Sequence, residues 1–495
     1  MTQYRKILSI ALAVSVVMAL TACDDSSADD VSTIAPAITK PTSTSALTTT
    51  DPDENAATDK EIKEVTTSEY TPDGNAGKLT WLGYYDIRDS DQYAIFTTEQ
   101  YGGEIEYISC SSGDAYFEKL GVMISSGDSP DIVSYEWTSF PHGMSKNMYE
   151  ALDGYIDTSS ALWSGIAQVA ENYAYKGKHY YYPYETKTNF ALNYNRKTLQ
   201  EAGLADPYDL YMENKWTWDT FKDLMIQWCN LADDNIGYAG CNATGIVSTT
   251  GVAMIEIEKD GTIINNVKSP DVARAMQFVM TLAHDDLVYQ NELGNWVSPE
   301  LWAINSDRIL FLGMNPDWTY TAAAAEIQNP SGVENDVCNT VSDFAFVPYP
   351  RDPSSDVYSI AYDTFGYMVP KGSDNIKGAV DWIYLNRIYA TDESVLATAR
   401  EDAINPTPIY YVEGKYKGMQ RWSVVWDPDL YDLWVDMKDP SKFNLIFDDC
   451  KGFNPEMTST MDTLLSQPMF DGASWTQLSE EYAPVIDTII AEYQK

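Results

Sequence analysis

The sequence predicts an α/β protein built from two lobes, and two observations support this. Short runs rich in β-branched and aromatic residues alternate with helical stretches, a pattern typical of a parallel or mixed sheet covered by helices. The chain from residue 78 to residue 495 is also long for a single hydrophobic core. We therefore expect two large lobes, each with its own core.

The first predicted strands follow one another closely. They cover residues 78–85, 104–110 and 131–135, and a helix over 115–125 connects the second strand to the third. Apolar residues in this helix recur at spacings that place most of them on one face, and the Ser-Gly-Asp-Ser-Pro run at 126–130 ends it. The order is strand, helix, turn, strand.

The same plan returns far down the chain. A strand and turn at 367–372 precede a helix over 376–388. No internal repeat of about 20 to 50 residues is evident, so the sequence does not predict a solenoid or a propeller.

The N-terminus has the features of a bacterial export signal. Arg5 and Lys6 precede an apolar stretch at 7–20 that is too short to span a bilayer as a mature helix. The tetrapeptide Leu-Thr-Ala-Cys ending at Cys23 is typical of a lipobox. We expect residues 1–22 to be removed as a lipoprotein signal peptide and Cys23 to carry lipid, which would hold the protein at the extracytoplasmic face of the cell membrane. An ordinary secretory signal with an incidental cysteine is the alternative.

Residues 23–77 are predicted to form a disordered, acidic tether. They consist mainly of Asp, Thr, Ser, Ala and Pro, and such a composition cannot bury enough apolar surface to offset its ordering entropy. As a flexible coil the segment would hold the folded body about 40 Å from the lipid on average. The aspartates at 51–55 resemble part of a calcium loop, but the required glycine and bidentate glutamate are missing, so no metal site is expected there.

Charge and composition exclude several classes of function. The formal net charge of -42 argues against nucleic acid or anionic lipid as a partner. His142, His179 and His284 do not have metal-ligand spacing, and no nucleophile elbow or phosphate loop is present. We expect no cofactor, no metal and no catalytic residue. Among the cysteines that follow the lipobox, Cys229 and Cys241 could pair, but buried free thiols are equally compatible with the sequence.

Several segments together resemble the extracellular solute-binding proteins of ABC importers, specifically family 1, whose members mostly bind sugars and oligosaccharides. Their order and spacing carry the resemblance, which covers most of residues 78–495. The matching segments are 116–120 leading into 126–133, 152–156, 181–183, 194–195 with 202–204, 216–221, 314–318 and 369–373. The segment 403–417 and the tail from Trp422 do not match clearly.

The resemblance implies a two-lobed clam of the type II periplasmic-binding-protein kind, with a ligand cleft between α/β lobes and chain crossings that act as a hinge. We expect crossings near 185–189, 357–363 and 391–401. It also implies closure around a carbohydrate and delivery to ABC permease subunits with their ATPase, by a protein that is a monomer. The expected division is 78–188 plus 357–395 for the N-terminal lobe and 189–356 plus 396–495 for the C-terminal lobe.

Aromatic and acidic residues in the loops after the strands fit a sugar site. Sugar rings stack their C–H faces on Trp or Tyr, and their hydroxyl groups bond to carboxylates and amides. Open α/β sheets bind ligands at the carboxyl ends of their strands, which points to the same loops. Trp318 is the first choice because the resemblance places a stacking tryptophan there, whereas Trp216 and Trp218 are expected to pack. The candidates are Tyr84, Tyr85, Asp86, Tyr135, Glu136, Trp137, Glu185, Asp317, Trp318, Asp363, Trp422 and Trp426.

Two alternatives remain open at this point. A surface-anchored glycoside hydrolase would need two carboxylates about 5 to 10 Å apart across a glycosidic bond, and the sequence contains many acids. A carbohydrate-binding module without a transport role is the other alternative, although it would have no need of a hinge.

Overall fold

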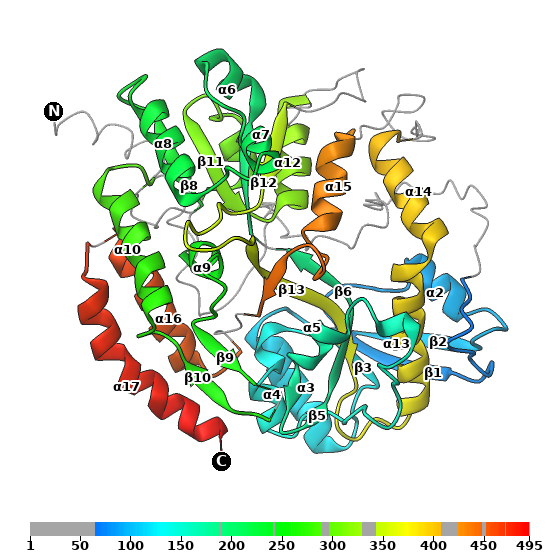
Figure 1. The fold of residues 1–495 in the computed structure, drawn as a ribbon. Coiled ribbons are helices and arrows are strands. Elements are labelled where there is room, and N and C mark those ends of the chain that lie inside the picture. Colours follow the sequence, from blue (N-terminus) through cyan, green and yellow to red (C-terminus); the bar gives the residue numbers. More distant parts are fainter. Residues whose placement is uncertain are drawn as a thin grey trace, which may run out of the picture.

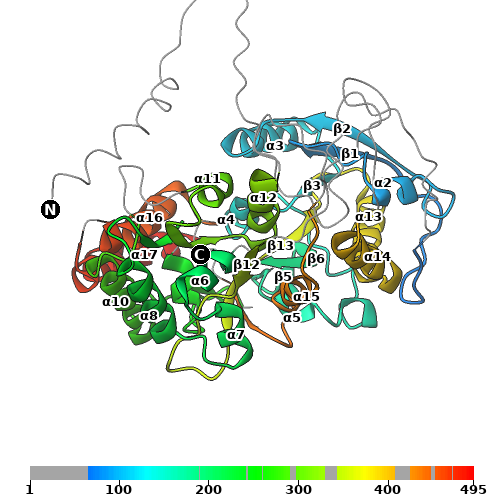
Figure 2. The same ribbon diagram turned by 90° about the horizontal axis from the view of Figure 1, so that it is seen from above.

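The computed structural model describes residues 65–188, 190–240, 243–258, 260–289, 297–328, 343–406, 424–447, 452–470 and 472–494. Two sheets with helices around them form the body (Figures 1 and 2). The fold is mixed α/β, as predicted, and each sheet is the centre of one lobe. Over the part of the chain that the structure describes, no helix has both the length and the apolar character needed to cross a membrane.

The first sheet is mixed. Its strand order is β14-β13-β3-β1-β2, and β6 also pairs with β13. The parallel strands β1, β2 and β3 lie where the sequence predicts the first three strands, while β13 runs antiparallel to both β3 and β6. The bounds are β1 (Gly77–Gly83), β2 (Gly103–Ser109), β3 (Ile132–Ser134), β6 (Tyr181–Thr188), β13 (Ser359–Met368) and β14 (Asn444–Ile446).

The second sheet has four strands in the order β12-β7-β11-β8. Strand β11 pairs in parallel with β8, and β7 runs antiparallel to β11 and β12. The central strand β11 is a nearly continuous apolar run, Ile-Leu-Phe-Leu-Gly-Met, and all of its residues except the last are buried, as in a strand that is covered on both faces. The bounds are β7 (Ala191–Asn195), β8 (Ile236–Ala239), β11 (Ile309–Met314) and β12 (Phe344–Val347).

Helix ends follow local sequence signals. The helix α3 (Asp114–Ser126) ends within the Ser-Gly-Asp-Ser-Pro run that was expected to end it, and Gly127 caps it with a left-handed φ of 82°. The helix α8 (Trp218–Cys229) begins with a capping box between Thr217 and Thr220. Trp218, the first residue of α8, and Trp216, just ahead of the helix, are both buried, so the prediction that they pack is confirmed.

Shorter elements and peripheral helices complete the two lobes. In the first lobe they are α2 (Asp91–Phe96), η1 (Trp137–Ser139), α4 (His142–Ser145), η2 (Ala161–Trp163), α5 (Ala167–Glu171), β4 (Ala174–Tyr175), β5 (Lys178–His179) and α13 (Ile376–Thr391). Around the second sheet and in the tail they are α6 (Arg196–Ala202), α7 (Pro207–Met212), α9 (Ala243–Ser248), β9 (Ile255–Ile257), β10 (Ile263–Asn265), α10 (Pro270–His284), α11 (Pro299–Ala303), α12 (Pro316–Gln328), α14 (Glu393–Ile404), α15 (Pro428–Asp436), α16 (Pro455–Phe470) and α17 (Trp475–Tyr493).

The chain passes between the two sheets more than once. It leaves the first sheet after β6, enters β7 at Ala191, and returns between β12 and β13. It then leaves again through α14, which contacts α13 and α15.

One further passage was not expected. After α15, which contacts β12 of the second sheet, the chain comes back to the first sheet as β14. The predicted C-terminal lobe included 396–495, so β14 departs from that division. Its Asn-Leu-Ile segment is too short to show a strand pattern in the sequence.

The folded body also begins earlier than predicted. The tether was expected to reach residue 77, but Val65 is buried and Tyr70 packs on α13. Cys110 and Cys229 are free thiols, and the other cysteines, including Cys23, lie outside the described residues.

Asp131 holds the start of the first sheet together. This buried carboxylate precedes β3 and accepts hydrogen bonds from the Thr80 N–H at 2.8 Å and the Thr80 hydroxyl at 2.9 Å. Its other oxygen accepts from the Ser373 hydroxyl at 2.7 Å and from the Asn375 N–H at 3.1 Å. Asn375 caps α13, so one carboxylate joins β1, β3 and the helix that covers them.

We predict that Asp131→Asn lowers the free energy of unfolding by about 2–3 kcal/mol, because an amide cannot accept from four donors and hydrogen bonds to a charged group are strong. Urea unfolding followed by tryptophan fluorescence measures this. Asp128→Asn, on the exposed turn before β3, is the control and should stay within about 0.5 kcal/mol of the parent. Equal effects of both substitutions would contradict the role of Asp131.

Candidate functional site

The end of β1 places two of its three candidate residues beside one another. The Tyr84 hydroxyl donates to Glu136 at 2.8 Å, and the rings of Tyr84 and Tyr85 meet edge to face at 5.3 Å. Burial, followed by the charge of Glu136, raises the pKa of Tyr84. Asp86 instead pairs with Arg88 at 2.7 Å, and the hydrogen bond from Arg88 lowers the pKa of Asp86. Asp86 therefore stabilises its own turn.

The loop after β3 separates its candidates into packed and accessible side chains. Tyr135 is only 6% exposed and stacks on Tyr181 at 4.4 Å, so it belongs to the core beneath the loop. Glu136 caps the short helix η1, in which Trp137 is 45% exposed. Of the three residues, Trp137 offers the largest accessible apolar surface.

Trp318 and Asp317 open α12 in the second lobe. The Trp318 N–H donates to Asp317 at 2.8 Å and to Asn315 at 3.0 Å, which fixes the first turn of the helix. The Asn315 side-chain amide in turn donates to the Thr188 carbonyl at 3.2 Å, at the end of β6. This bond joins the start of α12 to the last residue of a first-sheet strand. Trp318 is 37% exposed at this junction.

Two ion pairs lie next to the junction. Glu185 of β6 pairs with Lys438 at 2.8 Å, and Lys187 of β6 pairs with Asp363 of β13 at 2.9 Å. Lys187 and Asp363 are direct partners across the two strands. All four side chains are largely shielded from solvent, so the pairs are screened less than pairs on the surface.

Lys438 connects the lobes through its backbone as well as through its charged side chain. It follows α15, and its ammonium lies 3.5 Å from the centroid of the Trp434 ring. The Lys438 carbonyl accepts from the Thr186 hydroxyl of β6 at 2.6 Å. Backbone and side chain of Lys438 are thus both held against β6.

The environment of Asp317 shows that these groups share one electrostatic neighbourhood. Burial raises the pKa of Asp317, and the negative charge of Glu185 raises it further, whereas Lys438 and Lys187 lower it. Asp363 in turn raises the pKa of Tyr84. The structure therefore brings the candidates from β1, β6, β13 and α12 toward one region.

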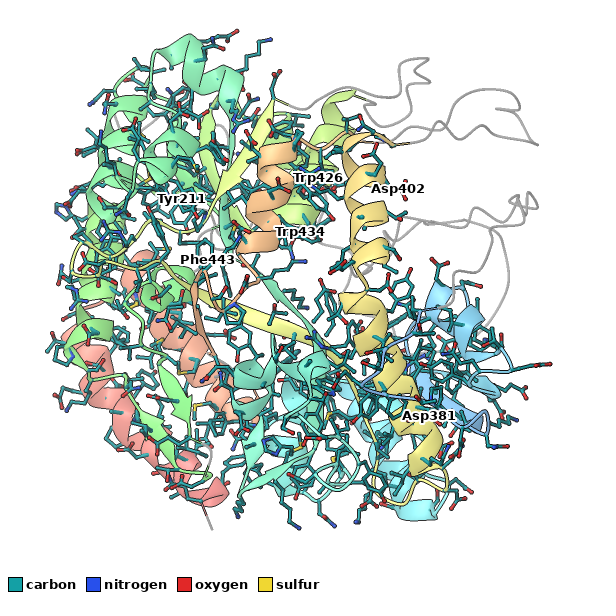
Figure 3. The ribbon with its side chains drawn as sticks, turned by 45° about the vertical axis from the view of Figure 1, so that its right-hand side comes forward. Tyr211, Asp381, Asp402, Trp426, Trp434 and Phe443 are labelled. Atoms are coloured by element: carbon teal, nitrogen blue, oxygen red, sulfur yellow. The ribbon has the colours of Figure 1, made fainter. Side chains whose placement is uncertain are left out.

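Trp426 occupies a different setting, and Trp422 lies outside the described residues. Trp426 packs on Tyr320 at 4.6 Å and on Trp434 at 5.8 Å, just ahead of α15 (Figure 3). These contacts make it part of the aromatic cluster that holds α15 on the second lobe. Trp434, which belongs to this cluster, also contacts Lys438 at the junction.

The arrangement is suited to binding a polar, ring-shaped molecule. Aromatic side chains provide stacking surfaces, and carboxylates and ammonium groups provide hydrogen-bond acceptors and donors. Among the described residues, no group of three or more His, Cys, Asp or Glu side chains is arranged to hold a metal ion.

Sequence reasoning missed Lys187, Lys438 and Trp434. Lys187 was detectable in principle, since it follows the candidate Glu185 at the same-face spacing of a strand. Lys438 and Trp434 belong to the tail that matched no family segment, and nothing in the local sequence connects them to β6.

Comparisons with known proteins were made at the levels of sequence and fold. A model of the bacterial extracellular solute-binding protein family matches residues 91–410. No curated protein sequence matches the chain.

Solved structures match most of the chain. An ABC transporter solute-binding protein from Thermotoga lettingae, bound with α-D-tagatose, has 17% identity and a TM-score of 0.53, and the match covers 84% of this chain and 100% of that one. A binding protein from B. animalis subsp. lactis in complex with β-1,6-galactobiose has 15% identity and a TM-score of 0.54, with 84% and 98% covered. UgpB from Mycobacterium tuberculosis in complex with glycerophosphocholine has 14% identity and a TM-score of 0.56, with 85% and 100% covered. These likenesses establish the two-lobed fold.

The raised pKa of Asp317 gives a pH-dependent prediction. The folded protein holds this proton more tightly than the unfolded chain, so ionising Asp317 destabilises the fold as pH rises from the usual carboxyl pKa of about 4 through the raised value. Asp317→Asn removes this penalty while its amide oxygen can still accept from Trp318. The variant should gain stability relative to the parent as pH rises from about 4 through the raised pKa of Asp317, measured by urea unfolding.

Asp285→Asn is the control of opposite sign. The hydrogen bond from Lys222 lowers the pKa of Asp285, so this interaction stabilises the fold above the usual carboxyl pKa and fades as pH falls through the lowered value. Asp285→Asn should lose stability relative to the parent at pH 7 and approach it in acid. A stability difference for Asp317→Asn that does not change with pH would contradict the prediction.

Proposed function

We propose that this chain, which belongs to the bacterial extracellular solute-binding proteins, captures a carbohydrate by lobe closure and delivers it to the permease of an ABC import system. The match to residues 91–410 confirms the resemblance found in the sequence at the level of this family. The family is one of substrate-binding proteins, and we assign no catalytic residue to the chain.

The junction between the lobes carries the proposal. The charges of Glu185 and Lys187 of the first lobe act on Asp317 of the second, which precedes Trp318 in α12. The hydrogen bond from Asn315 to Thr188 holds the start of α12 at the end of β6, and Asp363 pairs with Lys187. A ligand that contacts both groups would favour the closed arrangement of the lobes, because contacts made only on closure shift the equilibrium toward it.

The ligands of the matched structures support a polar ligand rich in hydroxyl groups. Two of the three proteins described above were solved with carbohydrates, α-D-tagatose and β-1,6-galactobiose, and one with glycerophosphocholine. We infer an oligosaccharide for this chain because several aromatic side chains, including Tyr85, Trp137 and Trp318, are accessible for stacking on successive rings.

A surface-anchored hydrolase is kept as the alternative because of Asp317. A carboxyl group with a raised pKa is what a general acid requires. Glycoside hydrolysis also needs a second carboxylate. The nearby acids Glu185 and Asp363 are poorly suited to that role, because each is paired with a lysine.

The binding proposal is tested by the melting temperature of residues 65–495 in the presence of mono- and oligosaccharides, with each mixture analysed afterwards for cleavage. A sugar that binds only the folded protein should stabilise it by about 2.7 kcal/mol when its concentration is 100 times Kd. The melting temperature should therefore rise with the logarithm of the sugar concentration. Trp318→Ala should weaken binding of that sugar about tenfold or more, whereas Trp318→Phe should retain most of it.

Each contrary outcome has a meaning of its own. Cleavage of the sugar that disappears in Asp317→Asn would identify a hydrolase. Binding that Trp318→Ala leaves unchanged would remove Trp318 from the site, and the absence of any shift across the sugar panel would refute the carbohydrate proposal.

We further propose that Cys23 carries the lipid anchor and that the residues after it form the tether. In the expressed full chain, Cys23→Ser should abolish incorporation of labelled palmitate and move the protein from the detergent phase to the aqueous phase of a Triton X-114 separation. Cys110→Ser is the control, since this half-buried cysteine lies within the first lobe. Continued lipid incorporation in Cys23→Ser would exclude this residue as the lipidation site.

A further inference from the structure

Residues 65–76, which we call the clasp, lie along α13 of the first lobe. Val65 is buried, and the Tyr70 ring stacks on the Tyr384 ring with centroids 3.7 Å apart and planes inclined by 4°. Stacked aromatic pairs add to the stabilisation that burial alone provides. A segment with the composition of a flexible linker is thus fixed on a helix more than 300 residues away in sequence.

A buried carboxylate on α13 depends on the clasp. The Asp381 side chain is 1% exposed, and it accepts a hydrogen bond from the Tyr70 hydroxyl. Lys377 lies 3.1 Å from Asp381 and 2.7 Å from Asp73, so it joins the helix to the clasp a second time. Detachment of the clasp would take the Tyr70 hydrogen bond from this buried carboxylate and leave Lys377 as its ion-pair partner, and a buried charge that loses a hydrogen-bond donor is destabilising.

The clasp runs opposite to α13 in direction. Asp73 is held at the first turn of the helix, Tyr70 about one turn later, and Thr67 shares a surface hollow with Thr391, the last residue of α13. The N-terminal end of the clasp therefore lies where α13 gives way to α14. At that point the chain leaves the first lobe toward the second.

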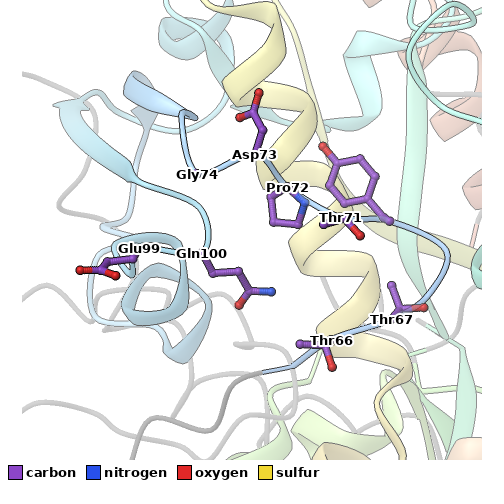
Figure 4. A pocket seen from close by; sticks show the side chains of 9 residues that line it. Thr66, Thr67, Thr71, Pro72, Asp73, Gly74, Glu99 and Gln100 are labelled. Carbon is purple, nitrogen blue, oxygen red and sulfur yellow. The ribbon is translucent and has the colours of Figure 1, made fainter.

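The hollow shown in Figure 4 has the clasp as one of its walls. It has a volume of about 350 Å³ and is lined by residues 66–67 and 70–74 together with Glu99 and Gln100. None of the candidate ligand-binding residues lines it. This hollow is a consequence of how the clasp packs, and we assign no ligand to it.

We propose that the clasp makes the first lobe the fixed lobe of the molecule. The segment that begins at the proposed lipid anchor on Cys23 then joins the body at Val65, beside the α13–α14 boundary of the first lobe. The described contacts of the clasp are with the first lobe, so relative to the attached N-terminal segment it is the second lobe that changes position on closure. The claim that the first lobe is the one held at the membrane rests on the proposed lipid anchor. The attachment of the clasp to α13 does not depend on that anchor.

Hydrogen exchange measured by mass spectrometry tests the attachment in the full chain carrying Tyr70→Ala, without sugar or membrane. The amides of 65–76 should exchange at least about tenfold faster than in the parent, and those of α13 should also lose protection. The amides of α10 and α17 in the second lobe should be unchanged. Glu69→Ala, which alters an exposed neighbouring side chain, is the matched control and should leave all of these rates unchanged.

Three results would overturn the proposal. The first is an unprotected clasp in the parent protein, and the second is unchanged exchange in Tyr70→Ala. The third is an equal loss of protection in α10 and α17, which would mean that the clasp supports the whole body and does not distinguish the lobes. If Tyr70→Ala fails to fold, Lys377→Met breaks the exposed half of the attachment and should give the same pattern in weaker form. Since no sugar is present, failure of the carbohydrate proposal would not alter these results.

Discussion

The short connection between β6 and β7 is the constraint on which the arrangement of the two lobes depends. Thr188 ends a strand of the first sheet and Ala191 begins a strand of the second. Three peptide steps span at most about 11 Å, so the two sheets must meet at this point. The Asn315 side chain bonds to the Thr188 carbonyl, which brings the start of α12 to the same place. The candidate site is therefore a consequence of how the chain crosses.

The charges at the crossing determine what the site favours. Lys187 and Lys438 each have a carboxylate partner, so an anionic ligand would have to compete with Asp363 and Glu185 for them. Asp317 occupies the first turn of α12, where the helix dipole would otherwise attract an anion. Hydroxyl groups avoid this competition because they can donate to carboxylates that remain paired with lysine. At the proposed ligand site, these charges favour a neutral molecule over an anionic one.

Local sequence patterns were sufficient for the elements that nearby residues determine. The first three strands and the end of α3 at Gly127 follow from signals within a few residues. The contacts that the sequence did not reveal are remote. Tyr70 and Asp381 are 311 residues apart, and Glu185 and Lys438 are 253 apart. The clasp was missed because a polar composition predicts disorder unless a partner surface is known.

The connections between the lobes differ in how firmly they are packed, and the most weakly packed of them is the one expected to move. The β6–β7 connection is short, and the passage from α15 to β14 is fixed at Lys438 by Thr186 and Glu185. In contrast, α14 has no buried residue along its length, and its link to α15 includes the exposed ion pair between Arg400 and Asp432. Segments with little buried apolar surface open and shift at low free-energy cost. Because the clasp ends beside the start of α14, the firmly attached and the weakly packed segments adjoin, and motion of the second lobe is expected to begin at that boundary.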